Sequence, residues 1–292
     1  MKGRKSLLWV LLFLLPNFLG FLLFQLGPIL ASLWLSFEKW DIMSPPIFVR
    51  LKNYIDLVSD PLFWQGLKAT AYYTVIGVPI AVSLGLVVAL LLNRKIKGLK
   101  LFRTMYFTPV VCSMVSVAVV WGWLYNRDFG LINSLLKGIG LSPLDWLGDE
   151  RLAIPSLAIM GAWKTIGYNM VLFLAGLQGI PQQLYEAAEI DGATSWSKFR
   201  YITLPLLSPT FFFISITSII GSFQVFDQVY IMTKGGPGNA TRVYYFYLYE
   251  NAFKFYRMGY ASAMAYILLC VILLLTFVQI KFFERFVIYE VT

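Results

Sequence analysis

The sequence predicts an all-α integral membrane protein with six transmembrane helices. Of its 292 residues, 59% are hydrophobic and only 13% are charged, and the mean hydropathy is +0.70. A soluble domain typically carries about 25% charged residues. Because so much apolar surface cannot be hidden inside one globule, lipid must be part of the solvent.

Six apolar stretches are long enough to cross a bilayer. Each reaches the roughly 20 residues that about 30 Å of hydrocarbon requires. Backbone amides in lipid must be satisfied within their own segment, and no strict alternation typical of a barrel is present, so each stretch is expected to be a helix. The predicted spans lie near residues 7–37, 67–92, 105–124, 152–177, 206–232 and 258–280.

The first stretch is the longest and contains Pro16 and Pro28. We therefore expect it to be tilted, kinked or extended past the membrane. A signal-peptide core usually runs about 7–15 residues, so this stretch is predicted to remain in the mature protein.

Basic residues predict the orientation. Lys2, Arg4 and Lys5 precede the first span, and no acid accompanies the five basic residues between spans two and three. The positive-inside rule then places the amino terminus, the 93–103 loop, the 180–205 loop and the carboxyl terminus in the cytoplasm. The pI of about 9.4 reflects this topology, so nucleic acid is not an expected partner. The five residues are Arg94, Lys95, Lys97, Lys100 and Arg103.

Catalytic and metal-binding patterns are missing from the sequence. The chain has no His, the commonest metal ligand and general base, so neither a metal site nor a Ser/His/Asp arrangement is predicted. Cys112 and Cys270 lie far apart in apolar stretches and are interpreted as packing residues. No phosphate-binding G-x-x-x-x-G-K-[ST] sequence occurs, so the chain is not predicted to be an enzyme or to bind ATP itself.

The polar loop at 180–205 is interpreted as a docking surface. Pro181 can start a helix and Gly192 suits the left-handed residue that ends one. Ala187 and Ala188 allow close approach of a partner, and carboxylates such as that of Glu186 can accept hydrogen bonds from its Arg or Lys. The alternative is an interfacial helix resting on lipid headgroups, but such helices usually carry basic residues on their polar face.

This loop resembles the EAA loop of binding-protein-dependent ABC importer permeases. The match comprises Glu186-Ala187-Ala188, then Gly192, then an Ile-x-Leu sequence ending at Pro205. Three further segments resemble the carbohydrate branch, which includes maltose- and glycerol-phosphate-type permeases. They are the LAGLQ-x-IP sequence at 174–181, the EIDGA sequence at 189–193 and the MT-x-GGP sequence at 232–237.

The resemblance implies a type I ABC importer fold like that of maltose permeases, in a bacterial or archaeal cell (inner) membrane. It also implies four kinds of partner: lipid, a second homologous permease forming a heterodimer, two ATPase subunits that bind ATP and Mg, and an external solute-binding protein. In this family the EAA loop is the coupling helix. The residues it assigns to ATPase coupling here are Glu186, Ala187, Ala188, Asp191, Gly192 and Pro205.

Two regions are expected. Residues 1–65 form an amino-terminal transmembrane helix with an external loop. Residues 66–286 form the permease core, with five transmembrane helices and the coupling loop.

Polar groups inside the spans predict the substrate pathway, because such groups usually face the bundle interior. Gln224 and Gln228 are expected to share a helix face with Asp227 beside them. Lys164 has an alternative role, pairing with an acid on a neighbouring helix. The predicted pathway residues are Lys164, Tyr168, Asn169, Gln224, Asp227 and Gln228.

Gly235, Gly236 and Pro237 are predicted to form a tight turn outside the membrane, where the solute-binding protein docks. A plain turn without a docking role is the alternative interpretation.

The predicted function is that of a permease subunit of an ATP-driven carbohydrate importer. The alternative is an ion-coupled secondary transporter or channel, which needs no ATPase and often shows inverted repeats with midplane acids. Asp227 is the one clear intramembrane acid, and no repeat is evident. The cargo stays open among sugars, oligosaccharides, polyols and glycerol phosphate.

Overall fold

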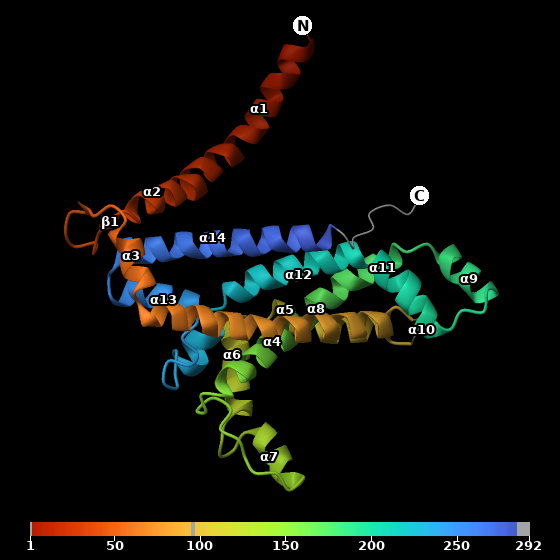
Figure 1. Ribbon diagram of the computed structural model, residues 1–292. Helices are drawn as coiled ribbons and strands as arrows, with labels where there is room; N and C mark the ends of the chain where they lie inside the picture. The colour runs from red at the N-terminus through yellow and green to blue at the C-terminus, as the bar shows by residue number, and fades with distance from the viewer. Residues whose placement is uncertain (1, 95–96, 285–292) are drawn as a thin grey trace. The chain divides into compact units, whose positions relative to one another are not determined.

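The computed structural model describes residues 2–94 and 97–284, and this part of the chain is almost entirely helical (Figure 1). Lys95, the carboxyl tail from residue 285 and the side chains of residues 1–9 and 11 lie outside the described structure. Two compact units are present. Unit 1 comprises Met1–Pro61 and Leu248–Val271, and unit 2 comprises Leu62–Tyr247 and Ile272–Thr292.

Unit 1 begins with a long, curved helical segment (Figure 1). Its residues 12–35 are apolar enough to cross a membrane. Pro28 has no N–H to donate, and a π-helical turn directly before Gly27 takes up the distortion that was expected here. No residue from Leu22 to Leu35 is buried within the chain. The elements are α1 (Lys2–Phe21), η1 (Leu22–Leu26) and α2 (Gly27–Leu35).

The remainder of unit 1 is held together by backbone carbonyls. The buried Asn53 amide donates to the carbonyl oxygens of Ser36 (2.8 Å) and Glu38 (2.9 Å). Gly259 packs so closely on the Glu38 carbonyl oxygen that no Cβ would fit. The elements are the antiparallel pair β1 (Glu38–Lys39) and β2 (Ile47–Phe48), α3 (Lys52–Val58), η4 (Glu250–Lys254) and the first part of α14 (Met258–Phe283).

Unit 2 is built on the long helices α4 and α8, which approach closely through small residues. A Cβ added at Gly77 would lie 3.6 Å from the Ala158 Cβ, and one added at Gly85 only 2.6 Å from the Asn169 Cβ. Buried side chains of α4, α8 and α12 fill the core beside this contact. The elements are α4 (Pro61–Leu92), α5 (Leu99–Val111), α6 (Met114–Leu124), α7 (Leu131–Gly138), α8 (Ala153–Gln178), α9 (Gln182–Ile190), α10 (Ser195–Lys198), η2 (Phe199–Thr203), α11 (Leu204–Leu206), α12 (Ser208–Phe223), η3 (Val229–Thr233) and α13 (Tyr244–Tyr249).

Two predicted spans are wrong as continuous helices. In the third, α5 and α6 meet at 100° across Cys112 and Ser113. In the fifth, the helices before and after Leu207 meet at 62°, and α12 ends at Phe223 instead of continuing to residue 232. Hydropathy reports only composition. It cannot detect irregular backbone, which membrane proteins tolerate where it is buried in protein or lines a cavity.

Four helical segments are long and apolar enough to cross a membrane, and the number rises to six if each bent pair is one crossing. Within unit 2, α9 and α10 lie near the end of α4 at Leu92 (Figure 1). The turn after η3 lies at the opposite end, where the Gln65 side chain donates to the Asn239 carbonyl oxygen (3.1 Å). The 180–205 loop and the predicted docking turn therefore lie at opposite ends of unit 2.

Candidate functional site

The 180–205 loop folds into the short helix that the sequence predicts. Pro181 caps α9, and Gly192 follows it with a φ of +74°, the left-handed conformation that was expected. Asp191 is the C-cap residue. Pro205 lies in α11, directly after the π-helical turn η2, which takes up the distortion caused by its missing N–H.

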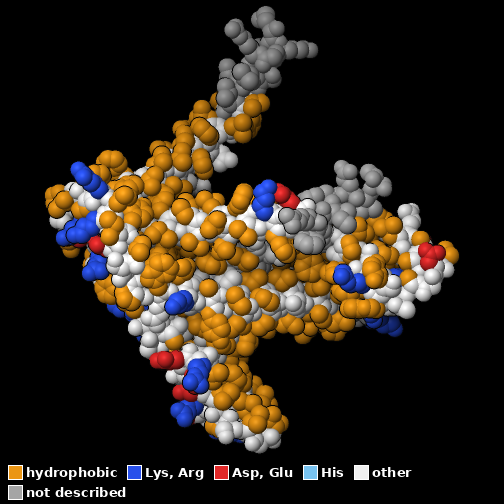
Figure 2. All heavy atoms as spheres, in the orientation of Figure 1, with side chains coloured by type: hydrophobic (Ala, Val, Ile, Leu, Met, Phe, Trp, Pro, Cys, Tyr) orange, Lys and Arg blue, Asp and Glu red, His pale blue; other side chains and the backbone are white. Residues whose placement is uncertain are grey.

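Most of the α9 surface is not covered by other parts of the chain. No residue of α9 is buried, and Figure 2 shows acidic side chains exposed over it. Glu186 and Ala187 are exposed, Ala188 is half-buried, and the Ile190 side chain is 87% exposed. Ile190 and the carboxylates beside it are therefore accessible on this surface.

Two side-chain contacts tie the loop to the segment that follows it. The hydroxyls of Tyr185 and the buried Thr203 lie 2.9 Å apart, and Lys198 pairs with Glu189 at 2.5 Å. Sequence reasoning missed Tyr185 and Thr203. Only the position of Tyr185 beside Leu184, on the half-buried side of α9, hinted at its role.

A cavity of about 310 Å³ lies among α4, α8 and α12 in unit 2. Four predicted pathway residues line it: Lys164, Tyr168, Asn169 and Gln228. Its wall also contains hydroxyl groups from Thr165, Thr217, Ser218 and Ser222. Amides, hydroxyls, two tyrosine rings and one cation thus reach into a cavity whose wall is otherwise mostly apolar.

The prediction that Gln224 and Gln228 share a helix face is wrong. Because α12 ends at Phe223, the backbone between the two glutamines is not helical, and their spacing of four no longer sets a common direction. Gln228 is buried and lines the cavity, whereas Gln224 and Asp227 are exposed and do not. Of these three predicted pathway residues, only Gln228 therefore lines the cavity.

Within the cavity, Gln228 is fixed by a partner that sequence reasoning missed. Its side-chain amide donates to the Tyr73 hydroxyl oxygen at 2.5 Å. Gly161 leaves room for this pair, since an added Cβ would overlap the Tyr73 hydroxyl and lie 3.2 Å from Gln228 Nε2. Lys164 Nζ donates to the Val110 carbonyl oxygen at 3.1 Å.

The predicted turn at Gly235–Pro237 is present. Gly235 has a φ of +85°, and the Gly236 amide donates to the Thr233 carbonyl oxygen (2.9 Å). The fully buried Thr241 fixes the turn by donating to the Gly236 carbonyl oxygen.

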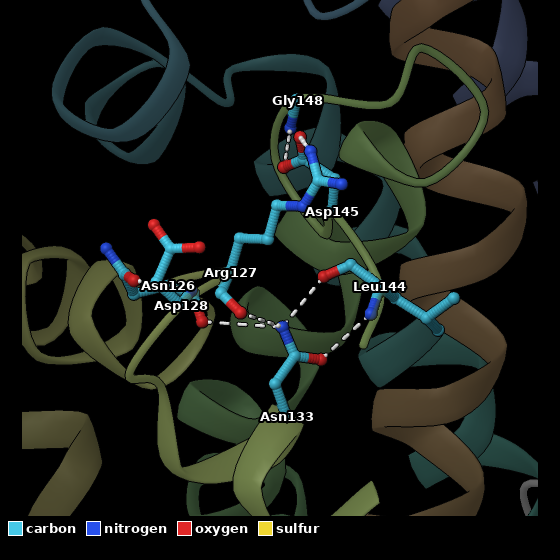
Figure 3. Close-up of polar contacts among 7 residues, drawn as sticks. All are labelled: Asn126, Arg127, Asp128, Asn133, Leu144, Asp145 and Gly148. Carbon is cyan, nitrogen blue, oxygen red and sulfur yellow. Dashed lines mark hydrogen bonds and ion pairs between the residues drawn. The ribbon is translucent and has the colours of Figure 1, made fainter. Parts of the chain in front are cut away.

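The connection between α6 and α8 is organised by Asn133, which was not singled out from the sequence (Figure 3). Its side chain is fully buried. It donates to the carbonyl oxygens of Arg127 (3.1 Å) and Leu144 (2.8 Å) and accepts from the Leu144 amide (3.0 Å). An Arg127–Asp145 ion pair at 3.6 Å closes the same loop.

A second cavity, of about 540 Å³, lies within unit 1. Three cations line it without an ion pair in the described part of the chain: Lys39, Lys52 and Arg257. Hydrogen bonds from the Ser44 side chain and amide lower the pKa of Asp41, which also lines this cavity. The described residues contain no group of three Asp, Glu or Cys side chains placed to hold a metal ion.

The fold defines the class first. Several apolar helices around a cavity that polar side chains reach into have the architecture of a membrane transport subunit. The chain belongs to the family described as "Binding-protein-dependent transport system inner membrane component", which matches residues 77–288. The resemblance that the EAA-type loop indicated is thereby confirmed.

Two relatives match over nearly their whole length. The lactose transport system permease protein LacF of Rhizobium radiobacter is 38% identical, covering 92% of this chain and 91% of LacF. The trehalose/maltose transport system permease protein MalF of Thermococcus litoralis is 36% identical, covering 95% of this chain and 93% of MalF.

A solved structure shows the same fold. It is a bacterial alginate ABC transporter in complex with an alginate pentasaccharide-bound periplasmic protein, with a TM-score of 0.83 and 22% identity, covering 97% of this chain and 96% of that chain. The protein is therefore an ABC importer permease, a transport component and not an enzyme. Nothing supports the ion-coupled alternative.

Proposed function

We propose that the chain forms the translocation pathway of an ATP-driven importer for a carbohydrate, a sugar or an oligosaccharide. LacF and MalF, named for lactose and for trehalose or maltose transport, support this class of cargo. The cavity supports it as well. Aromatic rings suit the apolar faces of sugars, and amides and hydroxyls suit their hydroxyl edges.

The α9 loop is proposed to couple this chain to an ATPase subunit. Glu186 anchors a basic group of an ATPase subunit, Ala187 and Ala188 form the packing face, and Gly192 makes the turn. Asp191 and Pro205 fix the ends of the loop. This assignment is supported by the exposure of Glu186 and Ala187 in a loop held by its own contacts, which moves as one body when its socket moves.

The proposed assembly contains this chain, a second homologous permease and two ATPase subunits that bind ATP and Mg. An external solute-binding protein delivers the cargo. The family's binding-protein dependence and the alginate transporter complex support this composition. We place the complex in a bacterial or archaeal cell membrane, with six crossings and with the 180–205 loop and both termini in the cytoplasm.

Residues 66–286 are proposed as the permease core, following an amino-terminal helix and external loop at 1–65. The family match over residues 77–288 supports this division. The solute-binding protein is proposed to contact the turn at Gly235, Gly236 and Pro237. The pathway assignment keeps Tyr168, Asn169 and Gln228, whereas Gln224 and Asp227 line the cavity only if another chain extends it.

Purification of the tagged chain from its native membranes tests the assembly. We expect a second, different permease in the same amount as the tagged chain, and ATPase subunits in twice that amount. Vesicles containing this complex and its binding protein are expected to take up a labelled sugar only when ATP is present on the side of the membrane where the ATPase subunits lie. Uptake that needs an ion gradient and no ATPase would overturn the proposal. Uptake of a non-carbohydrate alone would overturn the cargo class.

A further inference from the structure

The break in the third span leaves backbone groups that need partners. α5 ends at Val111, and Cys112 is extended with a ψ of 143°. The last carbonyl oxygens of a helix have no partner within the helix. The hydrocarbon of a bilayer cannot supply one, so the partner must come from the protein or from water in a cavity.

Lys164 of α8 supplies a partner to one of these carbonyls. Its Nζ donates to the Val110 carbonyl oxygen at 3.1 Å. A cation at a helix carboxyl end is also favoured by the helix dipole. In the described residues, Lys164 forms no ion pair, so its bond to Val110 takes the place of the acid partner considered from the sequence.

α8 contacts both helices of the break. Toward α5, Gly167 lies against the Tyr106 carbonyl oxygen, so closely that a Cβ would not fit. Toward α6, the Tyr125 hydroxyl donates to the Ser156 carbonyl oxygen at 3.0 Å. Lys164 lies along α8 between these two contacts.

The break also borders the cavity. Met114, the first residue of α6, lines it together with Lys164. A change in the angle between α5 and α6 would therefore change the wall of the cavity.

We propose that Lys164 is a positioning residue for transport, whose bond to the Val110 carbonyl holds the bend of the third span beside the cavity. The proposal rests on the proposed function only in treating this cavity as the pathway. Lys164 acts on the backbone of its own chain, and the shape of the cavity depends on that contact.

Both cysteines are exposed in this chain, and neither is packed inside it as the sequence suggested. Cys112 therefore provides a built-in reporter, because it lies at the bend. Cys270→Ser leaves it as the only cysteine of this chain. In that background, the rate of Cys112 labelling by a maleimide is measured in the assembled complex without nucleotide. Labelling is followed on the isolated band of this chain.

Lys164→Met is expected to change the labelling rate of Cys112 about tenfold and to lower uptake about as much, because a hydrogen bond to a charged group is lost. Lys164→Arg keeps the cation and its donors and is expected to remain within about twofold of the parent in both measurements. Thr165→Val is the matched control: it removes a cavity hydroxyl on the same helix whose bonds are to its own helix, and it leaves the labelling rate unchanged.

Loss of uptake with unchanged Cys112 labelling in Lys164→Met would overturn the proposal, since Lys164 would then act on the solute. Unchanged uptake and labelling would overturn it too. If Lys164→Met does not assemble, Lys164→Gln, which keeps a neutral donor, is compared with Lys164→Arg in the same way. Failure of the proposed function gives a different result. The parent would then show no ATP-dependent uptake, but the labelling rates of the parent and the Lys164 variants could still be compared.

Discussion

The α9 loop and the cavity of unit 2 differ in how their functional side chains are held. On α9, Glu186 is exposed and forms no hydrogen bond or ion pair within the described chain. In the cavity, Gln228 is bound to Tyr73 and Lys164 to Val110. The loop thus offers free groups to another chain, whereas these two groups of the cavity are held in fixed positions. Substitutions in the first should weaken association, and substitutions in the second should alter shape.

The largest effect is expected from Glu186→Lys. Reversing a charge that pairs across an interface costs about 2–5 kcal/mol, which corresponds to at least roughly 30-fold weaker association with the ATPase. Co-purification of the ATPase and ATP-driven uptake measure this. Asp128→Lys, the same charge change at an exposed acid in the α6–α8 connection, is the control and should keep both. Equal behaviour of the two variants would remove Glu186 from the coupling surface.

Gly161→Ala tests the fixed arrangement of the cavity. The new methyl group would overlap the Tyr73 hydroxyl and displace Gln228, at a cost of about 1–3 kcal/mol for overpacking. We expect a lower thermal-unfolding midpoint of the complex and about tenfold lower uptake.

Gly221→Ala is the matched control for this variant. Gly221 also lines the cavity and lies in a helix, but a Cβ there meets nothing within 4 Å. Its midpoint should stay the same or rise, because alanine favours helix over glycine by about 0.5–1 kcal/mol. If both variants lower the midpoint equally, the Tyr73–Gln228 contact does not limit the packing of the cavity.

The same contrast explains what the sequence predicted. The α9 helix, its proline start and the left-handed Gly192 follow from signals within about ten residues, and the structure contains all of them. The bends in the third and fifth spans were missed, because apolar composition is the same on both sides of a break. Gln224 was misplaced because α12 ends at Phe223, within a stretch that composition shows as one span.

Contacts between residues distant in sequence could not be predicted either. Tyr73 and Gln228 are separated by 155 positions, and Lys164 and Val110 by 54. No local pattern links them, since the first pair forms where α4 packs against the segment after α12, and the second where α8 packs against α5. Predicting which polar residues enter a pathway was therefore possible from their type, whereas predicting which ones are free to bind a solute was not.

Substitutions at Gly192 test the α9 loop through backbone conformation alone. A Cβ there meets no atom within 4 Å, so a substitution adds only the strain of a positive φ, roughly 1–2 kcal/mol for most residues. Gly192→Val should lower uptake several-fold. Gly192→Asn should stay nearer the parent, because asparagine adopts this conformation more readily. Uptake assays at matched protein levels rank the two, and the reverse order would show that backbone strain is not the cause.

The smallest effect is expected at the ion pair within the loop. Lys198→Met breaks a pair whose Glu189 carboxylate is 62% exposed, and such surface pairs contribute about 0–1 kcal/mol. Uptake should remain within about twofold of the parent. Tyr185→Phe removes the hydroxyl that contacts the buried Thr203, which keeps its bond to the Lys198 carbonyl oxygen, and losing one such hydrogen bond costs about 0.5–1.5 kcal/mol. The tyrosine variant should therefore loosen the loop more, measured as faster limited proteolysis between α9 and α10. If Lys198→Met is cleaved faster, the exposed pair holds the loop and the buried hydroxyl contact does not.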